Sequence, residues 1–234
     1  SGHVLHTLAE RTGFDPGQVN DVIWGCVSQV GEQSWNIGRS AVLAAGWPEH
    51  VPGTTLDRQC GSSQQATHFA AAAVISGQAD LVVAGGVESM TRVPMGITSQ
   101  QGPGKPFGPA MLERYSQGLV PQGISAELIA EKWSLSRQEL DRISLESHQR
   151  AARATEEGRF ESQIVPVEVD GETVTADEGI RWDTSLEKLG SLQPAFKADG
   201  VVTAGNSSQI SDGAAALLIM SEDKAEELGL EPMA

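Results

Sequence analysis

Hydrophobic and polar residues follow two periods along the first 88 residues, one typical of helices and one typical of strands. Helices are predicted at residues 4–13, 35–47 and 62–77, and strands at 19–28, 53–58 and 80–88. The turns between them are short and rich in Gly and Pro. Alternating helices and strands favour an α/β fold, with a mostly parallel sheet covered by helices on both faces.

This alternation stops at Ser89. Residues 90–110 carry repeated Gly and Pro and predict a long loop. Helices are predicted next at 124–136 and 136–160, the second starting with a Ser136–Glu139 capping box, and short strands at 163–169 and 172–177. A buried strand at 213–221 and a helix at 222–229 resume the first pattern. We therefore predict an α+β domain over residues 89–203, inserted into an α/β domain formed by residues 1–88 and 204–234.

Composition and charge restrict the function classes. Of 234 residues, 39% are hydrophobic and 20% charged, as in ordinary globular proteins, and the longest apolar stretch is too short to span a membrane. A net charge of −15 argues against binding nucleic acid or an acidic membrane. Residues 92–200 hold 12 of the 16 Lys and Arg but 17 of the 31 Asp and Glu. If the protein binds an anionic small molecule, this segment is where it is expected; taken alone, however, the pattern favours a solvated helical face of mixed charge.

Cys60, in the stretch LDRQCGSSQQ, is the candidate nucleophile. It precedes a predicted helix, and backbone N–H groups in the first helical turn favour a thiolate and could hold an oxyanion. The alternative is a buried structural thiol, which is the expected state of Cys26 in its apolar strand. With only these two cysteines and no secretory segment, a reducing compartment, the cytoplasm, is expected.

A cysteine nucleophile needs a base, and no histidine has a spacing that provides one. His68 is expected to pack or face solvent on the helix after Cys60, and His50 and His148 are expected on a loop and a charged helix. The sequence has no metal-ligand spacing and no phosphate-binding motif such as a Walker sequence or GxGxxG. Neither a metal nor a cofactor is expected.

Five ordered segments resemble the thiolase family. They are GCVSQVGEQSWNIGR, LDRQCGSSQQATHFAAAAVISGQADLVVAGGVESMTRVPMG, GRFESQIVPVEV with ADEGIRWDTSLEKLGSLQPAF, and GVVTAGNSSQISDGAAALLIMS. The resemblance spans essentially the whole chain. It implies a thiolase-like layered α/β/α N-terminal domain with an inserted loop domain that binds CoA.

The resemblance also implies an activity. In thiolases the cysteine that matches Cys60 attacks a 3-oxoacyl-CoA, forms an acyl-thioester and releases acetyl-CoA, after which CoA accepts the acyl group; the reverse reaction is a Claisen condensation. CoA is thus a substrate. Arg181 matches the arginine that packs against the adenine of CoA, and Phe196 and Ser208 match positions that line the pantetheine channel.

The resemblance identifies what this chain is expected to lack. The activating histidine, the water-holding asparagine and the second acid/base cysteine of thiolases lie in a C-terminal domain that this sequence does not contain, and the first strand is absent as well. We expect a piece of a longer protein, inactive in turnover by itself. The family also implies a homodimer or homotetramer, with Asp57 and Arg58 facing a neighbouring subunit and Trp24 and Trp35 in the core or at that interface.

Two departures from the family bear on the substrate. Pro121 and Gln122 stand where biosynthetic thiolases carry His and Met, and Gln209 stands where a glycine is usual. Pro121 is closer to the degradative branch of the family, whereas Gln122 fits neither branch. The larger side chain of Gln209 is expected to reshape the acyl end of the pocket. Degradative thiolysis of long or bulky acyl chains is therefore expected. Two alternatives stay open: a ketoacyl-synthase-type condensing enzyme, and a non-catalytic acyl-CoA-binding or scaffold protein derived from a thiolase.

Overall fold

The computed structural model describes residues 1–100, 102–116 and 118–233. The chain divides into two compact units, residues 1–104 with 210–234, and residues 105–209. The predicted insertion at 89–203 overlaps the second unit, and its limits stay a prediction. Within the described residues, no helix is both long enough and apolar enough to cross a membrane.

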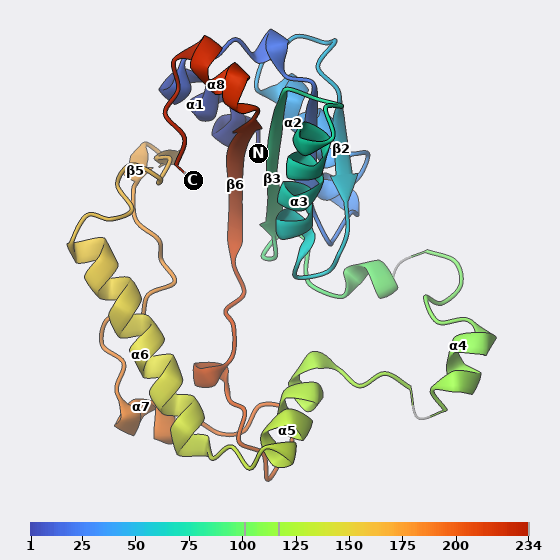
Figure 1. The fold of residues 1–234 in the computed structure, drawn as a ribbon. Helices are drawn as coiled ribbons and strands as arrows, with labels where there is room; N and C mark the ends of the chain where they lie inside the picture. Colours follow the sequence, from blue (N-terminus) through green and yellow to red (C-terminus); the bar gives the residue numbers. More distant parts are fainter. Residues whose placement is uncertain (101, 117, 234) are drawn as a thin grey trace. The chain divides into compact units, whose positions relative to one another are not determined.

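The first unit is built on a four-stranded sheet in the order β2-β1-β3-β6 (Figure 1). Its strands are β1 (Asp21–Gly25), β2 (Gly53–Leu56), β3 (Leu81–Ser89) and β6 (Asp212–Met220). Its helices are α1 (Gly2–Thr12), α2 (Ile37–Ala44), α3 (Ser62–Ile75) and α8 (Glu222–Leu228). β1 is parallel to both β2 and β3, whereas β6 is antiparallel to β3. The mostly parallel α/β fold predicted from the sequence is confirmed.

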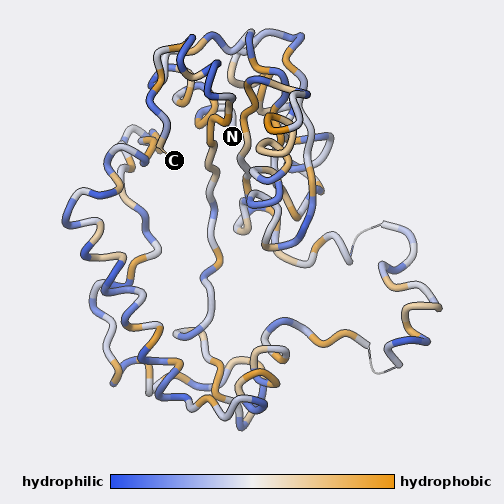
Figure 2. Tube along the Cα trace, in the orientation of Figure 1, coloured by the Kyte–Doolittle hydropathy of each residue, from blue (hydrophilic) through white to orange (hydrophobic). Residues whose placement is uncertain are grey.

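Helices cover both faces of this sheet. The larger core gathers residues of α1, α2 and one face of the strands around Trp24, which is fully buried. On the other face, Ala66 and Ala70 of α3 pack against Ile23, Val82 and Ala84. Hydrophobic residues accordingly concentrate in this sheet (Figure 2). Because successive strand residues point to opposite faces, a continuous apolar run in β1 and β3 supplies both cores.

One prediction about buried residues is wrong, and of the two places expected for Trp35 only the subunit interface stays a prediction. The strand predicted at 213–221 is present as β6, but it is not buried: Leu217 is 52% exposed. β6 lies at the end of the strand order, so among the described residues one side of its ladder has no neighbouring strand. Its Ala-rich, Leu-rich sequence does not distinguish such an edge strand from a central one. Trp35 is 95% exposed and therefore does not fill the core.

The second unit is mostly helical. Its helices are α4 (Pro109–Arg114), α5 (Gln122–Lys132), α6 (Arg137–Glu156) and α7 (Leu186–Gly190), and β4 (Val167–Val169) and β5 (Glu172–Val174) form an antiparallel hairpin. The predicted capping box is present, since Ser136 Oγ accepts from Glu139 N–H and the Glu139 carboxylate accepts from Ser136 N–H. The short helices α4 and α7 were not predicted, because five or six residues carry too little periodicity to reveal a helix.

Candidate active site

The N-terminus of α3 rests on the carboxyl ends of β1 and β3, where both strands carry glycine. A Cβ on Gly25 would lie 2.5 Å from the backbone nitrogen of Ser63, and a Cβ on Gly86 would lie 2.1 Å from Ser63 Oγ. Any larger residue at either position would push the helix outward. The two glycines therefore let α3 begin directly at this edge of the sheet, which is where open α/β sheets bind their ligands.

A tight turn joins β2 to α3. Asp57 Oδ1 accepts from the N–H of Gln59 at 2.6 Å. Ser62 Oγ accepts from the N–H of Arg58 at 2.9 Å and donates to the carbonyl of Gln59 at 2.7 Å. Gln59 has a left-handed backbone, with φ 49°. A non-glycine residue in this region costs energy, and the three side-chain bonds are what hold it there.

Cys60 lies in this turn, as a free and exposed thiol. The predicted strand-to-helix junction is confirmed, and so is the predicted start of the helix at Ser62. α3 begins two residues after Cys60, with Gly61 as its N-cap.

This position still suits a nucleophile. The N–H groups of the first turn of α3 have no helical carbonyl to donate to, and the helix dipole adds partial positive charge at the same end. Of these, the N–H of Ser62 is taken by the carbonyl of Gln59, whereas Ser63 and Gln64 follow it in the turn. Exposure makes the thiol of Cys60 accessible, and donors beside it can stabilise a developing oxyanion.

Cys26 has the opposite environment. It is 1% exposed, and its Sγ lies 3.3 Å from Glu88 Oε1. Burial, followed by the hydrogen bond to Glu88 and the charge of that carboxylate, raises the pKa of Cys26 to about 12. Glu88 Oε1 also accepts from Gln33 Nε2 at 2.9 Å and from the N–H of Ser28 at 3.2 Å. Cys26 is thus a structural thiol in a buried polar cluster.

Three histidines of the first unit lie in surroundings other than the Cys60 turn. His50 Nε2 lies 2.9 Å from the carbonyl of Gly17, and His6 pairs with Glu10. His68 is exposed on α3. Across residues 1–100, 102–116 and 118–233, no hydrogen bond joins Cys60 to a histidine, and no three His, Cys, Asp or Glu side chains are placed to hold a metal ion.

The three residues expected to contact CoA all lie in the second unit. Arg181 is exposed, and its N–H donates to His148 Nδ1 of α6 at 3.2 Å. Phe196 is 47% exposed, and its ring lies against the start of α5: a Cβ on Gly123 would be 2.2 Å from ring atoms of Phe196. Ser208 is exposed. Nothing in their sequence spacing relates Arg181 to His148, or Phe196 to Gly123.

A buried network fixes the turn that precedes Ser208. Asp141 on α6 is 3% exposed, and it accepts from Arg137 Nε at 2.8 Å and from Asn206 Nδ2 at 3.0 Å. Asn206 Oδ1 in turn accepts from the N–H of Thr203 at 2.7 Å. This network was not predicted from the sequence. Its only signal was an acidic residue at a position of α6 that the helical period assigns to the packed face.

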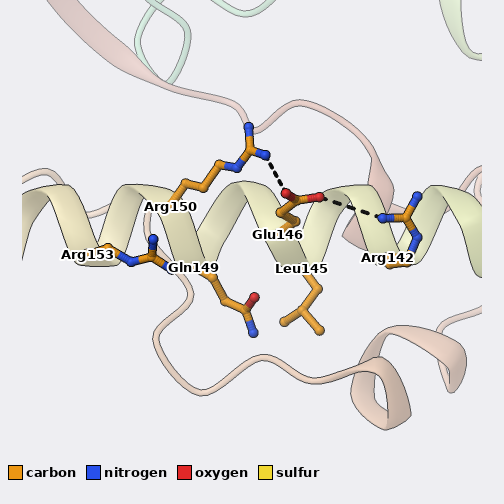
Figure 3. A pocket seen from close by; sticks show the side chains of 6 residues that line it. All are labelled: Arg142, Leu145, Glu146, Gln149, Arg150 and Arg153. Atoms are coloured by element: carbon orange, nitrogen blue, oxygen red, sulfur yellow. Dashed lines mark hydrogen bonds and ion pairs between the residues drawn. The ribbon is translucent and has the colours of Figure 1, made fainter.

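A groove along α6 is rich in arginine, but its residues come from one helix (Figure 3). Glu146 pairs with both Arg142 and Arg150, one turn to each side. The lining residues are Arg142, Leu145, Glu146, Gln149, Arg150 and Arg153. Exposed pairs of this kind contribute little to stability, and the groove contains no nucleophile, so it is a charged helical face rather than a catalytic site.

Comparison with known proteins decides the family. The profile described as "Thiolase, N-terminal domain" matches residues 1–223. The chain belongs to the thiolase family. The match covers the Cys60 turn in the first unit and all three expected CoA contacts in the second, and it favours a thiolase over a ketoacyl synthase.

Three relatives of this thiolase-family chain are named as thiolases or as an acyltransferase. It is 48% identical to a steroid 3-ketoacyl-CoA thiolase of Mycobacterium tuberculosis, over 97% of this chain and 57% of the relative. It is 44% identical to a 3-ketoacyl-CoA thiolase of Psychrobacter cryohalolentis, over 100% of this chain and 60% of the relative. A probable acetyl-CoA acyltransferase of Staphylococcus aureus is 42% identical, over 99% and 62%. The chain thus spans about three fifths of the length of these relatives.

Proposed function

We propose that this chain is the nucleophile-bearing part of a thiolase that cleaves 3-oxoacyl-CoA with CoA into acyl-CoA and acetyl-CoA, or runs the reverse Claisen condensation. The observation that carries the proposal is the exposed thiol of Cys60 at the N-terminus of α3, in a chain of the thiolase family. Names of the relatives, which are 3-ketoacyl-CoA thiolases, support the substrate class.

The reaction proceeds in two transfers. The Cys60 thiolate attacks the 3-oxo carbon, the bond between C2 and C3 breaks, and the electron pair left on C2 takes a proton, which gives acetyl-CoA. The acyl group remains on Sγ as a thioester. The thiol of a second CoA then loses its proton and attacks the thioester carbonyl, releasing acyl-CoA and the Cys60 thiolate. N–H groups at the start of α3 stabilise the oxyanion in both steps.

Both transfers need a base, and none is bonded to Cys60 in the part of the chain that the structure describes. We propose that the base belongs to the portion of the relatives that this chain does not span. By itself, the chain then forms the acyl-enzyme slowly and does not turn over. Multiple-turnover thiolysis by this polypeptide would contradict that proposal.

We further propose that Arg181 binds the adenine of CoA and that Phe196 and Ser208 line the pantetheine channel. All three are exposed in the second unit, which holds most of the basic residues of an acidic protein. Pro121, Gln209 and the steroid-related name of one relative support the further proposal that the reaction is degradative thiolysis of bulky acyl chains.

We also propose a cellular compartment and an oligomeric state for this protein. Two free cysteines suit the cytoplasm. β2 is an edge strand, and Asp57 and Arg58, which follow it, are exposed. Trp35 is also exposed, and the next residue, Asn36, bonds to Gly53 and Thr55 of β2. These features support a homodimer or homotetramer with this edge at the interface. Analytical ultracentrifugation of the purified protein tests the assembly.

Intact-mass spectrometry of the protein after incubation with acetoacetyl-CoA tests the activity. Addition of one acetyl group, located on Cys60 by peptide mapping and absent from Cys60→Ser, is the expected result. An adduct that persists in Cys60→Ser would rule out Cys60 as nucleophile. Absence of any adduct would favour the non-catalytic acyl-CoA-binding protein instead.

A further inference from the structure

Hydrogen bonds to its backbone groups hold the loop that carries Arg181. In this Arg181 loop (residues 177–184), the N–H of Gly179 donates to Asp177 Oδ1 at 2.7 Å, and the carbonyl of Gly179 accepts from Gln209 Nε2 at 2.5 Å. The N–H of Arg181 donates to His148 Nδ1 at 3.2 Å, and its carbonyl accepts from the N–H of Thr184 at 3.2 Å. Each backbone polar group of Gly179 and Arg181 therefore has a partner.

Two of these four partners come from distant parts of the chain. Gln209 is 30 residues beyond Gly179, and His148 lies 33 residues before Arg181, on α6. Asp177 and Thr184 belong to the loop itself and can only shape it locally. The bonds from His148 and Gln209 are the ones that fix the loop relative to the rest of the second unit.

The space around Gly179 is tight, so a side chain at this position would crowd both Asp177 and Gln209. A Cβ on Gly179 would lie 3.0 Å from Asp177 Oδ1 and 3.4 Å from Gln209 Nε2. Glycine thus lets the side chains of Asp177 and Gln209 reach the N–H and the carbonyl of the same residue. A glycine at position 209, which the family resemblance leads one to expect, could not make this bond, because it has no side-chain donor.

The side chain of Arg181 is left available. It is exposed, and its guanidinium makes no hydrogen bond or ion pair with any residue that the structure describes. The neighbouring carboxylate of Asp183 is taken by Lys188. The loop thus fixes the backbone of Arg181 on both sides while its planar cation faces outward, an arrangement suited to stacking on a flat aromatic ligand.

We propose that Gln209 and His148 are positioning residues that hold the Arg181 loop for contact with the adenine of CoA. This proposal rests on the proposed function, because it takes the nucleotide of CoA as the ligand. An arginine on a pinned loop loses less conformational freedom on binding than one on a free loop, so the two bonds increase affinity without touching the ligand. Gln209 then supplies a restraint on the loop that a glycine at this position would not supply.

The test compares CoA with pantetheine, which lacks the nucleotide. Dissociation constants of both are measured by calorimetry for the wild-type protein, Arg181→Ala, Gln209→Leu, His148→Leu and His148→Asn. Leucine removes the donor or acceptor, whereas the Oδ1 of asparagine can accept at the position of His148 Nδ1. Gln149→Leu, on the exposed side of the same helix as His148, is the matched control. Hydrogen exchange of peptides covering 177–184 reports directly on the loop.

Loss of one such bond should weaken CoA binding about three- to tenfold and leave pantetheine binding unchanged. Exchange in residues 177–184 should accelerate in Gln209→Leu and His148→Leu, while His148→Asn and Gln149→Leu behave as wild type. Equal weakening of CoA and pantetheine, or unchanged CoA binding with Arg181→Ala weakened, would overturn this proposal and leave the proposed function standing. A wild-type protein that binds no CoA, or unchanged binding in Arg181→Ala, would instead overturn the proposed nucleotide contact, and this proposal with it.

Discussion

Ser63 of α3 and Gly86 of β3 are in direct contact, with Ser63 Oγ at 2.1 Å from the place that a Cβ on Gly86 would take. The carbonyl of Gly25 lies 2.6 Å from the same place. A side chain can rotate away from such a clash, but a backbone carbonyl cannot. This contact sets how closely the start of α3, and the Cys60 turn before it, approaches the sheet.

Gly86→Ala should therefore lower both stability and the reactivity of Cys60. Overpacking of this kind costs about 1–3 kcal/mol in the free energy of unfolding, and the shifted helix moves its N–H groups away from the thiol. Urea unfolding and the rate of alkylation of Cys60 measure the two effects. Gly213→Ala is the matched control, because Gly213 pairs with the residue next but one along β3 and has open space around its Cα. Equal effects of both substitutions would contradict this account.

Alkylation should distinguish the two cysteines. Iodoacetamide at neutral pH reacts with thiolates, and Cys60 is exposed while Cys26 is 1% exposed with a pKa raised to about 12. The native protein should take up one label, on Cys60, and Cys60→Ser should take up none. In urea, both thiols become accessible, so the wild-type protein should take up two. Labelling of Cys26 in the native state would show that its burial is not maintained in solution.

Stability should fall at alkaline pH because of Cys26. Burial, then the hydrogen bond and charge of Glu88, raise its pKa from 9.0 to about 12. Between these two values the unfolded chain releases the proton while the folded protein retains it, so the free energy of unfolding falls as pH rises through this window. Below pH 9.0 both states keep the proton and this contribution is constant. Unfolding by urea at several pH values should show a steeper loss for wild type than for Cys26→Ala; identical slopes would mean that Cys26 ionises equally easily in both states.

The first unit could be predicted closely because its signals are local. Gly13 and Gly77 mark helix ends with φ of 72° and 73°, as glycine after a helix usually does. The alternation of apolar runs with helices fixes the parallel sheet around Trp24. What local signals do not contain is the order of strands, so the edge position of β6 and the exposure of Leu217 were missed.

The candidate site was predictable only in part. Cys60 stands out as a cysteine before small residues at the start of a helix, and the family resemblance indicates its role. Long-range side-chain hydrogen bonds stabilise the second unit internally. Asp141 bonds to Asn206, 65 residues away, and Gln209 bonds to Gly179, 30 residues away. Side-chain hydrogen bonds over such separations leave no periodic trace in the sequence, because each involves a single residue at either end.

Phe196, which is proposed to line the pantetheine channel, packs against Gly123 of α5. A Cβ on Gly123 would lie 2.2 Å from the Cδ1 and Cγ atoms of Phe196, so Gly123→Ala must displace the ring. The ring is 47% exposed and can swing towards solvent, so the loss of stability should be small, about 1 kcal/mol or less. If Phe196 lines the pantetheine channel, CoA and pantetheine should both bind more weakly, by the same factor, unlike the effect proposed for Gln209. Calorimetry of both ligands is the measurement, and Gly190→Ala, at a position with open space in the same unit, is the control. In a Phe196→Ala background the substitution at Gly123 should have no further effect; an undiminished effect there would show that Gly123 acts by some route other than the ring of Phe196.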